Sequence, residues 1–92
     1  MRTVRIPDPL LRELGVYPPE FKRKVRKALD DLRTSPSGKP LKDELEGLFS
    51  RRVGRHRIVF RLEGQAIVIL TIGDRESVYE EAVRLVSRRT SR

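Results

Sequence analysis

The stretch FSRRVGRHRIVF, residues 49–60, carries one glycine between two runs of β-forming residues. A glycine in the first place of a two-residue loop favours a type II′ turn, which here is Gly54-Arg55. This turn sets a register in which Phe49 lies opposite Phe60. Because the register of a hairpin determines which side chains share a face, this single turn constrains the fold more than any other feature of the chain.

The register sorts the hairpin side chains onto two faces, since successive side chains of a strand point to opposite sides of the sheet. One face is mostly apolar and is expected to pack on helices: Phe49, Arg51, Val53, His56, Ile58 and Phe60. The other face holds Leu48, Ser50, Arg52, Arg57, Val59 and Arg61. On this second face Arg52 lies directly opposite Arg57, and like charges in a cross-strand pair are destabilising. The pair therefore predicts either a neutralising carboxylate, with Asp74 and Glu76 as candidates, or a bound anion.

The rest of the chain predicts an α+β fold in which N-terminal helices pack on a small, curved antiparallel sheet, with a further helix at the C-terminus. About four strands are expected, at residues 3–6, 48–53, 55–62 and 66–72. Helices are expected at residues 9–14, 20–33 and 77–88. The second helix has an apolar stripe at helical spacing, formed by Phe21, Val25, Ala28, Leu29 and Leu32. Residues 39–47 fit either one helical turn or an anchored loop.

The composition limits the chemistry that the chain can perform. The 92 residues predict one domain, residues 1–92, with a tail at 88–92 that is expected to fray. The chain has no cysteine and one histidine, which excludes disulfides and zinc–thiolate sites, so no metal or cofactor is expected. That histidine, His56, is a general-base candidate by residue type. Because it lies on the apolar face opposite Val53, we expect a structural role for it.

The charge of the chain indicates the class of its partners. Twenty-one basic residues against thirteen acidic ones give a formal net charge of +8. A field of this sign favours polyanions, nucleic acid first and acidic proteins second. The alternative is a surface that only keeps the domain soluble. No apolar run approaches a membrane span and the N-terminus lacks the apolar core of a signal peptide, so we expect a cytoplasmic protein without a membrane partner.

The segment after the last strand supplies further candidates for an anion site. A turn at Glu63-Gly64 would place Arg57 opposite Leu70. The chain beyond that strand could then return Arg75 and Tyr79 to the arginine pair. A tyrosine beside a cluster of cations can stack on a base or transfer a proton, and the alternative is an ordinary half-buried ring.

Two segments of the sequence resemble the RelE/ParE toxin superfamily. The first runs from Lys39 to Phe60 and contains KPLK, LEGLFSRRVG and RHRIVF. The second runs from Ile67 to Tyr79 and reads IVILTIGDRESVY. The likeness in order and spacing covers roughly residues 29–85. It implies a RelE-like α+β fold and a toxin of a type II toxin–antitoxin system.

RelE-type members of this superfamily are ribosome-dependent endoribonucleases that cut mRNA in the decoding site and so inhibit translation. The resemblance implies attack by the 2′-hydroxyl of the substrate on the adjacent phosphate, without a metal. Position by position, it implies catalytic roles for Arg52, Arg57, Arg75 and Tyr79. The arginines would act as phosphate and transition-state clamps. Tyr79 would carry a proton or stack on a base, with Arg75 as the alternative acid.

Contacts to RNA are expected from seven further residues: Lys22, Arg23, Lys39, Lys42, Ser50, Arg55 and Arg61. The chain departs from the RelE pattern at two of these positions and at His56. Ser50 stands where RelE-type enzymes often carry a lysine or an arginine, and Arg51 cannot replace it because it points to the opposite face. His56 stands where a tyrosine is common, and Arg55 where an aspartate is common.

The expected partners are the ribosome with its mRNA and a cognate antitoxin, an acidic or amphipathic segment that wraps the toxin. ParE-type members of the superfamily instead poison DNA gyrase by binding it, without nuclease chemistry, and the same fold serves both activities. A basic module that acts only as a partner of its antitoxin is a third possibility. The combination of Arg52, Arg57 and Tyr79, which ParE-like members generally lack, favours the nuclease.

Overall fold

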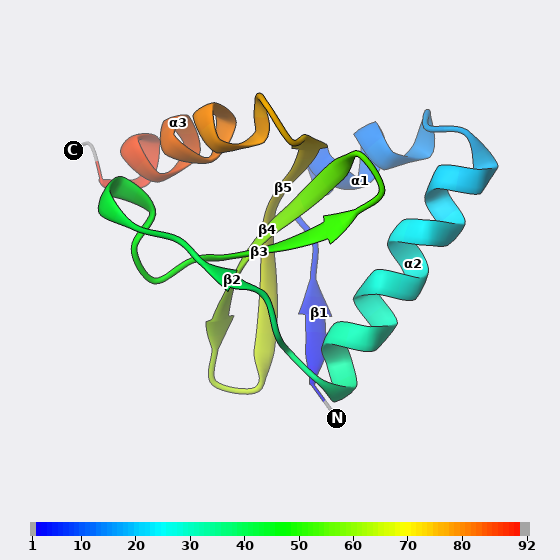
Figure 1. Cartoon of the computed structure of the whole chain (residues 1–92), viewed down its shortest axis with the longest axis horizontal. Coiled ribbons are helices and arrows are strands. Elements are labelled where there is room, and N and C mark those ends of the chain that lie inside the picture. Colours follow the sequence, from blue (N-terminus) through cyan, green and yellow to red (C-terminus); the bar gives the residue numbers. More distant parts are fainter. Residues whose placement is uncertain (1, 91–92) are drawn as a thin grey trace.

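The computed structural model describes the backbone of residues 2–90 and the side chains of residues 2–87. Its elements are β1 (Thr3–Arg5), α1 (Asp8–Gly15), α2 (Pro19–Thr34), β2 (Lys39–Pro40), the 3₁₀ turn η1 (Asp43–Leu45), β3 (Phe49–Val53), β4 (His56–Glu63), β5 (Ala66–Asp74) and α3 (Val78–Thr90). The strands form one sheet in the order β1-β5-β4-β3-β2 (Figure 1). The α+β prediction is confirmed.

The hairpin of β3 and β4 has the register that the sequence predicts. Phe49 pairs with Phe60, and Arg52 pairs with Arg57. Gly54 has a φ of 61°, whereas Arg55 is not among the described residues with positive φ. A positive φ at the first loop position alone is the pattern of a type II′ turn.

The sheet differs from the predicted one at both of its edges. It has a fifth strand, β2, whose residues Lys39 and Pro40 pair with Ser50 and Phe49. Residues 39–47 therefore contain a short edge strand followed by the single 3₁₀ helical turn η1, so the helical-turn alternative describes part of this segment and the short strand was not predicted. The sheet is also mixed, because β1 runs parallel to β5. Parallel neighbouring strands need a long connection between them. Here α1, α2 and the strands β2 to β4 lie between β1 and β5 in the chain, so the connection is long enough.

The predicted register between β4 and β5 is wrong. Arg57 lies opposite Gly73 and not opposite Leu70. The turn is formed by Gly64, with a φ of 58°, and Gln65, because Glu63 already pairs with Ala66. A β-bulge next to Val59 then shifts the register by one more residue.

Helices cover both faces of the sheet (Figure 1). On one face the predicted stripe of α2 is confirmed, because Val25, Ala28 and Leu32 are buried against Ile58 and Phe60 of β4. On the other face α3 packs on β4 and β5. This second core consists of Leu45, Leu48, Val59, Val78 and Ala82. The face that carries Arg57 is therefore partly covered, and the site lies at the edge of this second core.

The helix ends differ slightly from the predicted ones. α1 begins at Asp8, one residue earlier than predicted, with Pro7 in the N-cap position and without a side-chain cap. α2 is one residue longer at each end than the predicted helix at residues 20–33. α3 begins at Val78 and continues to Thr90, past the predicted end at residue 88. Of the tail that is expected to fray, residues 88–92, the backbone of 88–90 is helical, and residues 91–92 lie outside the described residues.

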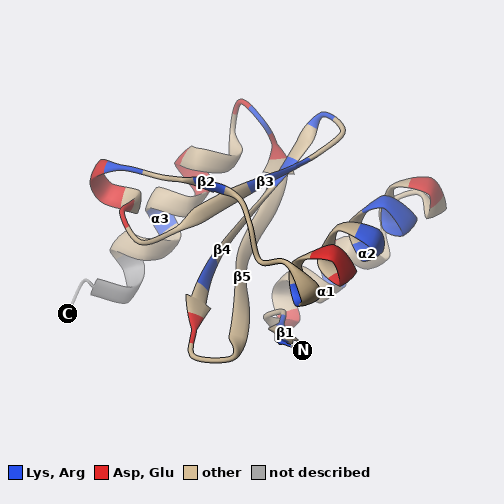
Figure 2. Ribbon diagram, turned by 60° about the horizontal axis from the view of Figure 1, so that its bottom comes forward, with Lys and Arg blue, Asp and Glu red and all other residues tan. Residues whose placement is uncertain are grey.

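The basic residues are spread over several elements. Figure 2 shows Lys and Arg along α2 and at the tip of the β3–β4 hairpin. Lys24 of α2 lines one pocket together with Arg52 and Arg55 of the tip. Within residues 2–90, none of the helices has both the length and the apolar character that crossing a bilayer requires.

Gly38 provides a test of how the chain leading into β2 packs on the sheet. A Cβ at this position would lie 2.9 Å from the Ser50 carbonyl oxygen and 3.2 Å from the Phe60 ring. Because that carbonyl belongs to a paired strand, we expect Gly38→Ala to lower the free energy of unfolding by about 1–3 kcal/mol in urea titrations.

Gly15→Ala is the matched control, because a Cβ at Gly15 would have no neighbour within 4 Å. It should leave the free energy of unfolding unchanged or raise it by up to about 1 kcal/mol. Equal urea midpoints for the two variants would contradict the close packing at Gly38.

Candidate functional site

A buried serine connects two of the predicted catalytic residues. Ser50 on β3 is 1% exposed. Nη1 of Arg57, on the neighbouring strand β4, donates a hydrogen bond of 3.0 Å to Ser50 Oγ. The same Oγ lies 3.1 Å from the hydroxyl oxygen of Tyr79, which is in the first turn of α3. The two strands of the hairpin and the more distant helix α3 thus meet at one hydroxyl group.

The packing explains why these groups meet. Ser50 and Val59 pair across β3 and β4 on the face that α3 covers, and Val78 next to Tyr79 is 1% exposed in that core. With Val78 fixed, the ring of Tyr79 is half-buried over the sheet. Gly73, opposite Arg57, brings no side chain into this space, and a Cβ there would lie 3.6 Å from a Val78 methyl group.

Among residues 2–87, the two opposed arginines form no ion pair with a carboxylate. Arg52 Nε donates to the carbonyl oxygen of Gly54 at 3.2 Å, and Arg57 donates to Ser50. Within residues 2–87, the ion pairs involve other side chains. Of the two carboxylates that the sequence offered as neutralising partners, Asp74 accepts from the backbone N–H of Glu76 at 2.8 Å, and Glu76 is in none of these ion pairs. The positive charge of Arg57 is therefore half-buried and uncompensated, which favours an anion next to it.

Arg75 joins the tip of the hairpin. Its backbone N–H donates to the carbonyl oxygen of Arg55 at 3.2 Å, which extends the contact of β5 with the β3–β4 turn. A groove of about 370 Å³ lies at this tip and is lined by Arg52, Arg55, Asp74, Arg75 and Glu76. The structure therefore brings Arg75 to Arg52, although the register that suggested this was wrong.

Tyr79 also faces a second groove of about 370 Å³, formed with the β2–η1 segment. Lys39 and Lys42 line this groove. Lys39 is placed there by β2, because it pairs directly with Ser50 and so lies on the same face of the sheet. Asp43 lines the same groove with a φ of 57° and is the only non-glycine residue between 2 and 90 with positive φ.

Three of the remaining predicted RNA contacts, Lys22, Arg23 and Arg61, lie apart from this site. Lys22 and Arg23 are exposed on α2, which packs on the other face of the sheet. Arg61 is bound to Glu63 through a 2.7 Å ion pair near the β4–β5 turn. Ser50 is within the site but is too deeply buried for a surface contact, so its hydroxyl acts on Arg57 and Tyr79.

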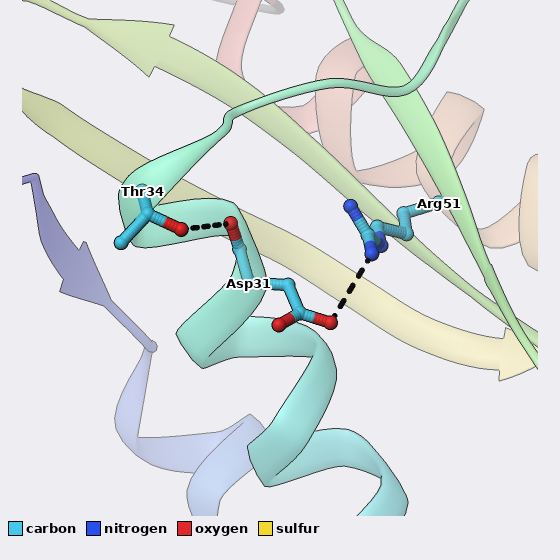
Figure 3. A network of polar contacts seen from close by, with 3 residues as sticks. All are labelled: Asp31, Thr34 and Arg51. Carbon is cyan, nitrogen blue, oxygen red and sulfur yellow. Dashed lines mark hydrogen bonds and ion pairs between the residues drawn. The ribbon is translucent and has the colours of Figure 1, made fainter.

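Arg51 and His56 have structural surroundings, as their face predicts. Arg51 points to α2, where its Nη2 lies 3.4 Å from Asp31 Oδ2 (Figure 3). The imidazole of His56 packs against Phe21, with ring centroids 4.4 Å apart, and edge-on against Tyr17 at 6.1 Å. Neither side chain contacts the Ser50 group in the described residues.

Sequence reasoning missed the role of Ser50 as the link between Arg57 and Tyr79. Two signals in the sequence pointed to it. Ser50 shares a face with Arg57 in the hairpin register, and it is a small polar residue where the RelE pattern often has a cation. The arrangement that results is a cation, a buried hydroxyl and a phenol in contact, with further cations in the grooves on either side. Such a group can bind a phosphate and transfer a proton.

Comparisons with known proteins agree with this architecture. The sequence profile described as the ParE toxin of the type II toxin–antitoxin system parDE matches residues 4–79. Toxin RelG of Mycobacterium tuberculosis is 37% identical over 82 residues, which cover 84% of this chain and 94% of RelG.

Solved structures show the same fold. A chain in the RelBE2 toxin–antitoxin complex of Mycobacterium tuberculosis superposes with a TM-score of 0.68 and 35% identity, over 80% of this chain and 98% of that one. A variant of the Escherichia coli toxin RelE in its free state gives a TM-score of 0.74 at 18% identity, over 90% and 95% of the two chains. The chain therefore belongs to the RelE/ParE superfamily of toxins from type II toxin–antitoxin systems.

Proposed function

We propose that this toxin is a ribosome-dependent endoribonuclease that cleaves mRNA in the decoding site without a metal and so inhibits translation. The observation that carries the proposal is the contact of Arg57, Ser50 and Tyr79. It combines an uncompensated guanidinium with a phenol at one point of the surface. A module that only bound a protein partner would not need a buried hydroxyl joining these two groups.

The reaction consists of one displacement at phosphorus. The 2′-oxygen of the substrate attacks the adjacent phosphate and its proton passes to solvent. As the new P–O bond forms, the bond from phosphorus to the 5′-oxygen breaks. That oxygen takes up a proton, so the products are a 2′,3′-cyclic phosphate and a 5′-hydroxyl. The negative charge that develops on the phosphoryl oxygens is where a fixed cation lowers the barrier most.

The residues divide into three roles in this proposal. Arg57, held by Ser50, stabilises the charge on the phosphoryl oxygens, and Tyr79 carries a proton. Arg52 and Arg75, in the groove at the hairpin tip, bind the RNA backbone on one side of the scissile phosphate. Lys39 and Lys42, in the groove beside Tyr79, bind the backbone on the other side.

We also propose a cognate antitoxin as the partner that silences this site. The similar chain from Mycobacterium tuberculosis was solved in a toxin–antitoxin complex, and the same is true of RelE–RelB from Pyrococcus horikoshii. A net charge of +8 favours an acidic segment of such a partner. Covering the groove beside Tyr79 and the groove at the hairpin tip would exclude RNA.

The alternative is a ParE-like toxin that inhibits DNA gyrase by binding it, and the name of the matching family profile favours this possibility. The two functions make different demands on Arg57. A phosphate clamp needs its guanidinium, whereas binding to gyrase needs a complementary surface that survives the loss of one half-buried side chain.

Arg57→Ala should lower the rate of mRNA cleavage on programmed ribosomes by about 10²–10³-fold, because one fixed donor to the developing charge is lost. Arg12→Ala is the charge-matched control, since Arg12 is exposed on α1. It should cleave at the wild-type rate. Growth arrest that persists in Arg57→Ala, together with loss of DNA supercoiling by gyrase, would instead support the ParE-like function.

The double variant Lys39→Ala/Lys42→Ala should weaken binding to mRNA-programmed ribosomes more than it lowers the rate at saturation. If each lysine contacts one phosphate of a single strand, the slope of log affinity against log salt should fall by about 1.4. Arg12→Ala/Lys27→Ala removes the same charge from helices on the other face and should leave the slope unchanged. Equal losses in the two double variants would contradict a specific role for the groove.

A further inference from the structure

The direction of the hydrogen bonds at Ser50 follows from the groups involved. A guanidinium can only donate, so Ser50 Oγ is the acceptor in its 3.0 Å contact with Arg57. This contact leaves the hydroxyl proton of Ser50 without an assigned acceptor.

The acceptor for that proton is the hydroxyl oxygen of Tyr79. Ser50 is 1% exposed, so water does not reach it freely. Among the described residues no buried side-chain polar atom lacks a hydrogen-bond partner, and the only other partner of Ser50 Oγ is Tyr79, at 3.1 Å. If Tyr79 donated to Ser50, the serine proton would be a buried donor without an acceptor, which native structures avoid. The chain of donation therefore runs from Arg57 through Ser50 to Tyr79.

This direction determines the chemistry that is open to Tyr79. Because its oxygen accepts from Ser50, its own proton is directed away from that contact and is free to be donated to a bound ligand. The ring lines the groove that also contains Lys39 and Lys42, so a ligand in that groove can reach the phenol. The guanidinium of Arg57 polarises the Ser50 hydroxyl and so strengthens the hydrogen bond that Ser50 donates. This hydrogen bond also stabilises the negative charge left on the Tyr79 oxygen when the Tyr79 proton departs.

We infer that Ser50 is a positioning residue that makes Tyr79 the proton donor to the 5′-oxygen, an inference that rests on the nuclease function proposed above. When the bond from phosphorus to the 5′-oxygen breaks, the Tyr79 O–H bond breaks as well and its proton forms the new 5′-hydroxyl. The resulting phenolate oxygen accepts the hydrogen bond from Ser50. Water then returns a proton to Tyr79, which balances the proton lost from the 2′-hydroxyl.

A substrate that needs no acid tests this role directly. An mRNA with sulfur in place of the bridging 5′-oxygen at the cleavage position has a leaving group that departs without a proton. On ordinary mRNA, Tyr79→Phe should cleave about 10²-fold more slowly than the wild type, and Ser50→Ala about 10-fold more slowly. On the sulfur substrate, both should cleave within about threefold of the wild-type rate. Arg57→Ala should remain slow on both substrates, because its role is in charge stabilisation.

The controls separate positioning from folding. Among residues 2–87, Thr71 is the other buried residue with a side-chain hydroxyl, and it lies in the same cross-strand row, since Ser50 pairs with Val59 and Val59 with Thr71. Thr71→Val removes that hydroxyl and should cleave both substrates at the wild-type rate. Ser50→Thr retains a hydroxyl and should restore cleavage of ordinary mRNA. If the wild type cleaves ordinary mRNA but Ser50→Ala stays equally slow on both substrates, Ser50 does not act through Tyr79, while the nuclease function stands.

The direction of donation can also be measured without any activity. In NMR spectra of the folded protein, a slowly exchanging hydroxyl proton should belong to Ser50 and show cross-peaks to the ring protons of Tyr79. It should disappear in Ser50→Ala and remain in Arg57→Lys. A slowly exchanging proton that belongs to Tyr79 itself would overturn the inference, whether or not the protein cleaves mRNA.

Discussion

The structure depends on the two-residue turn at Gly54-Arg55. This turn decides that Ser50 and Arg57 lie on one face of the hairpin, while Phe49 and Phe60 lie on the other. The face of Phe49 and Phe60 packs on α2. The rings and aliphatic side chains on this face form the larger core together with those of α2. The face of Ser50 and Arg57 is covered by α3 over Leu48, Ser50 and Val59. Its charged part is left uncovered, so the same register that builds the core also assembles the site.

Much of this could be predicted from the sequence because it depends on local rules. The turn residue, the alternation of side chains and the apolar stripe of α2 identified the hairpin, both of its faces and the opposed pair Arg52 and Arg57. The predicted β4–β5 register is wrong for two reasons. The rule that places Gly54 first in its loop also fits Gly64-Gln65, but the prediction placed the turn at Glu63-Gly64, and the bulge beside Val59 has no distinct sequence signal. The parallel pairing of β1 and the two-residue strand β2 follow from tertiary packing.

The site shows the same division between local and tertiary causes. Arg52, Arg57, Arg75 and Tyr79 were all candidates from the sequence, and the structure places Arg57 with Tyr79, and Arg52 with Arg75. Their connection through Ser50 could not be predicted, because it depends on where α3 docks on the sheet. In this chain a buried hydroxyl occupies a position where RelE-type enzymes often have a cation. The charge at the proposed reaction centre thus comes from Arg57 alone, held in place by a neutral neighbour.

The position of the scissile phosphate tests the central claim most directly, namely that Arg57 and Tyr79 form the reaction centre. It can be measured in a structure of the toxin on a ribosome programmed with mRNA whose 2′-hydroxyl at the cleavage position is methylated and cannot attack. We expect a non-bridging phosphate oxygen at hydrogen-bond distance, about 2.7–3.2 Å, from the Arg57 guanidinium. The 5′-oxygen should lie next to the Tyr79 hydroxyl. RNA bound along Lys22 and Arg23 of α2, with the Ser50 group facing away from it, would contradict the account.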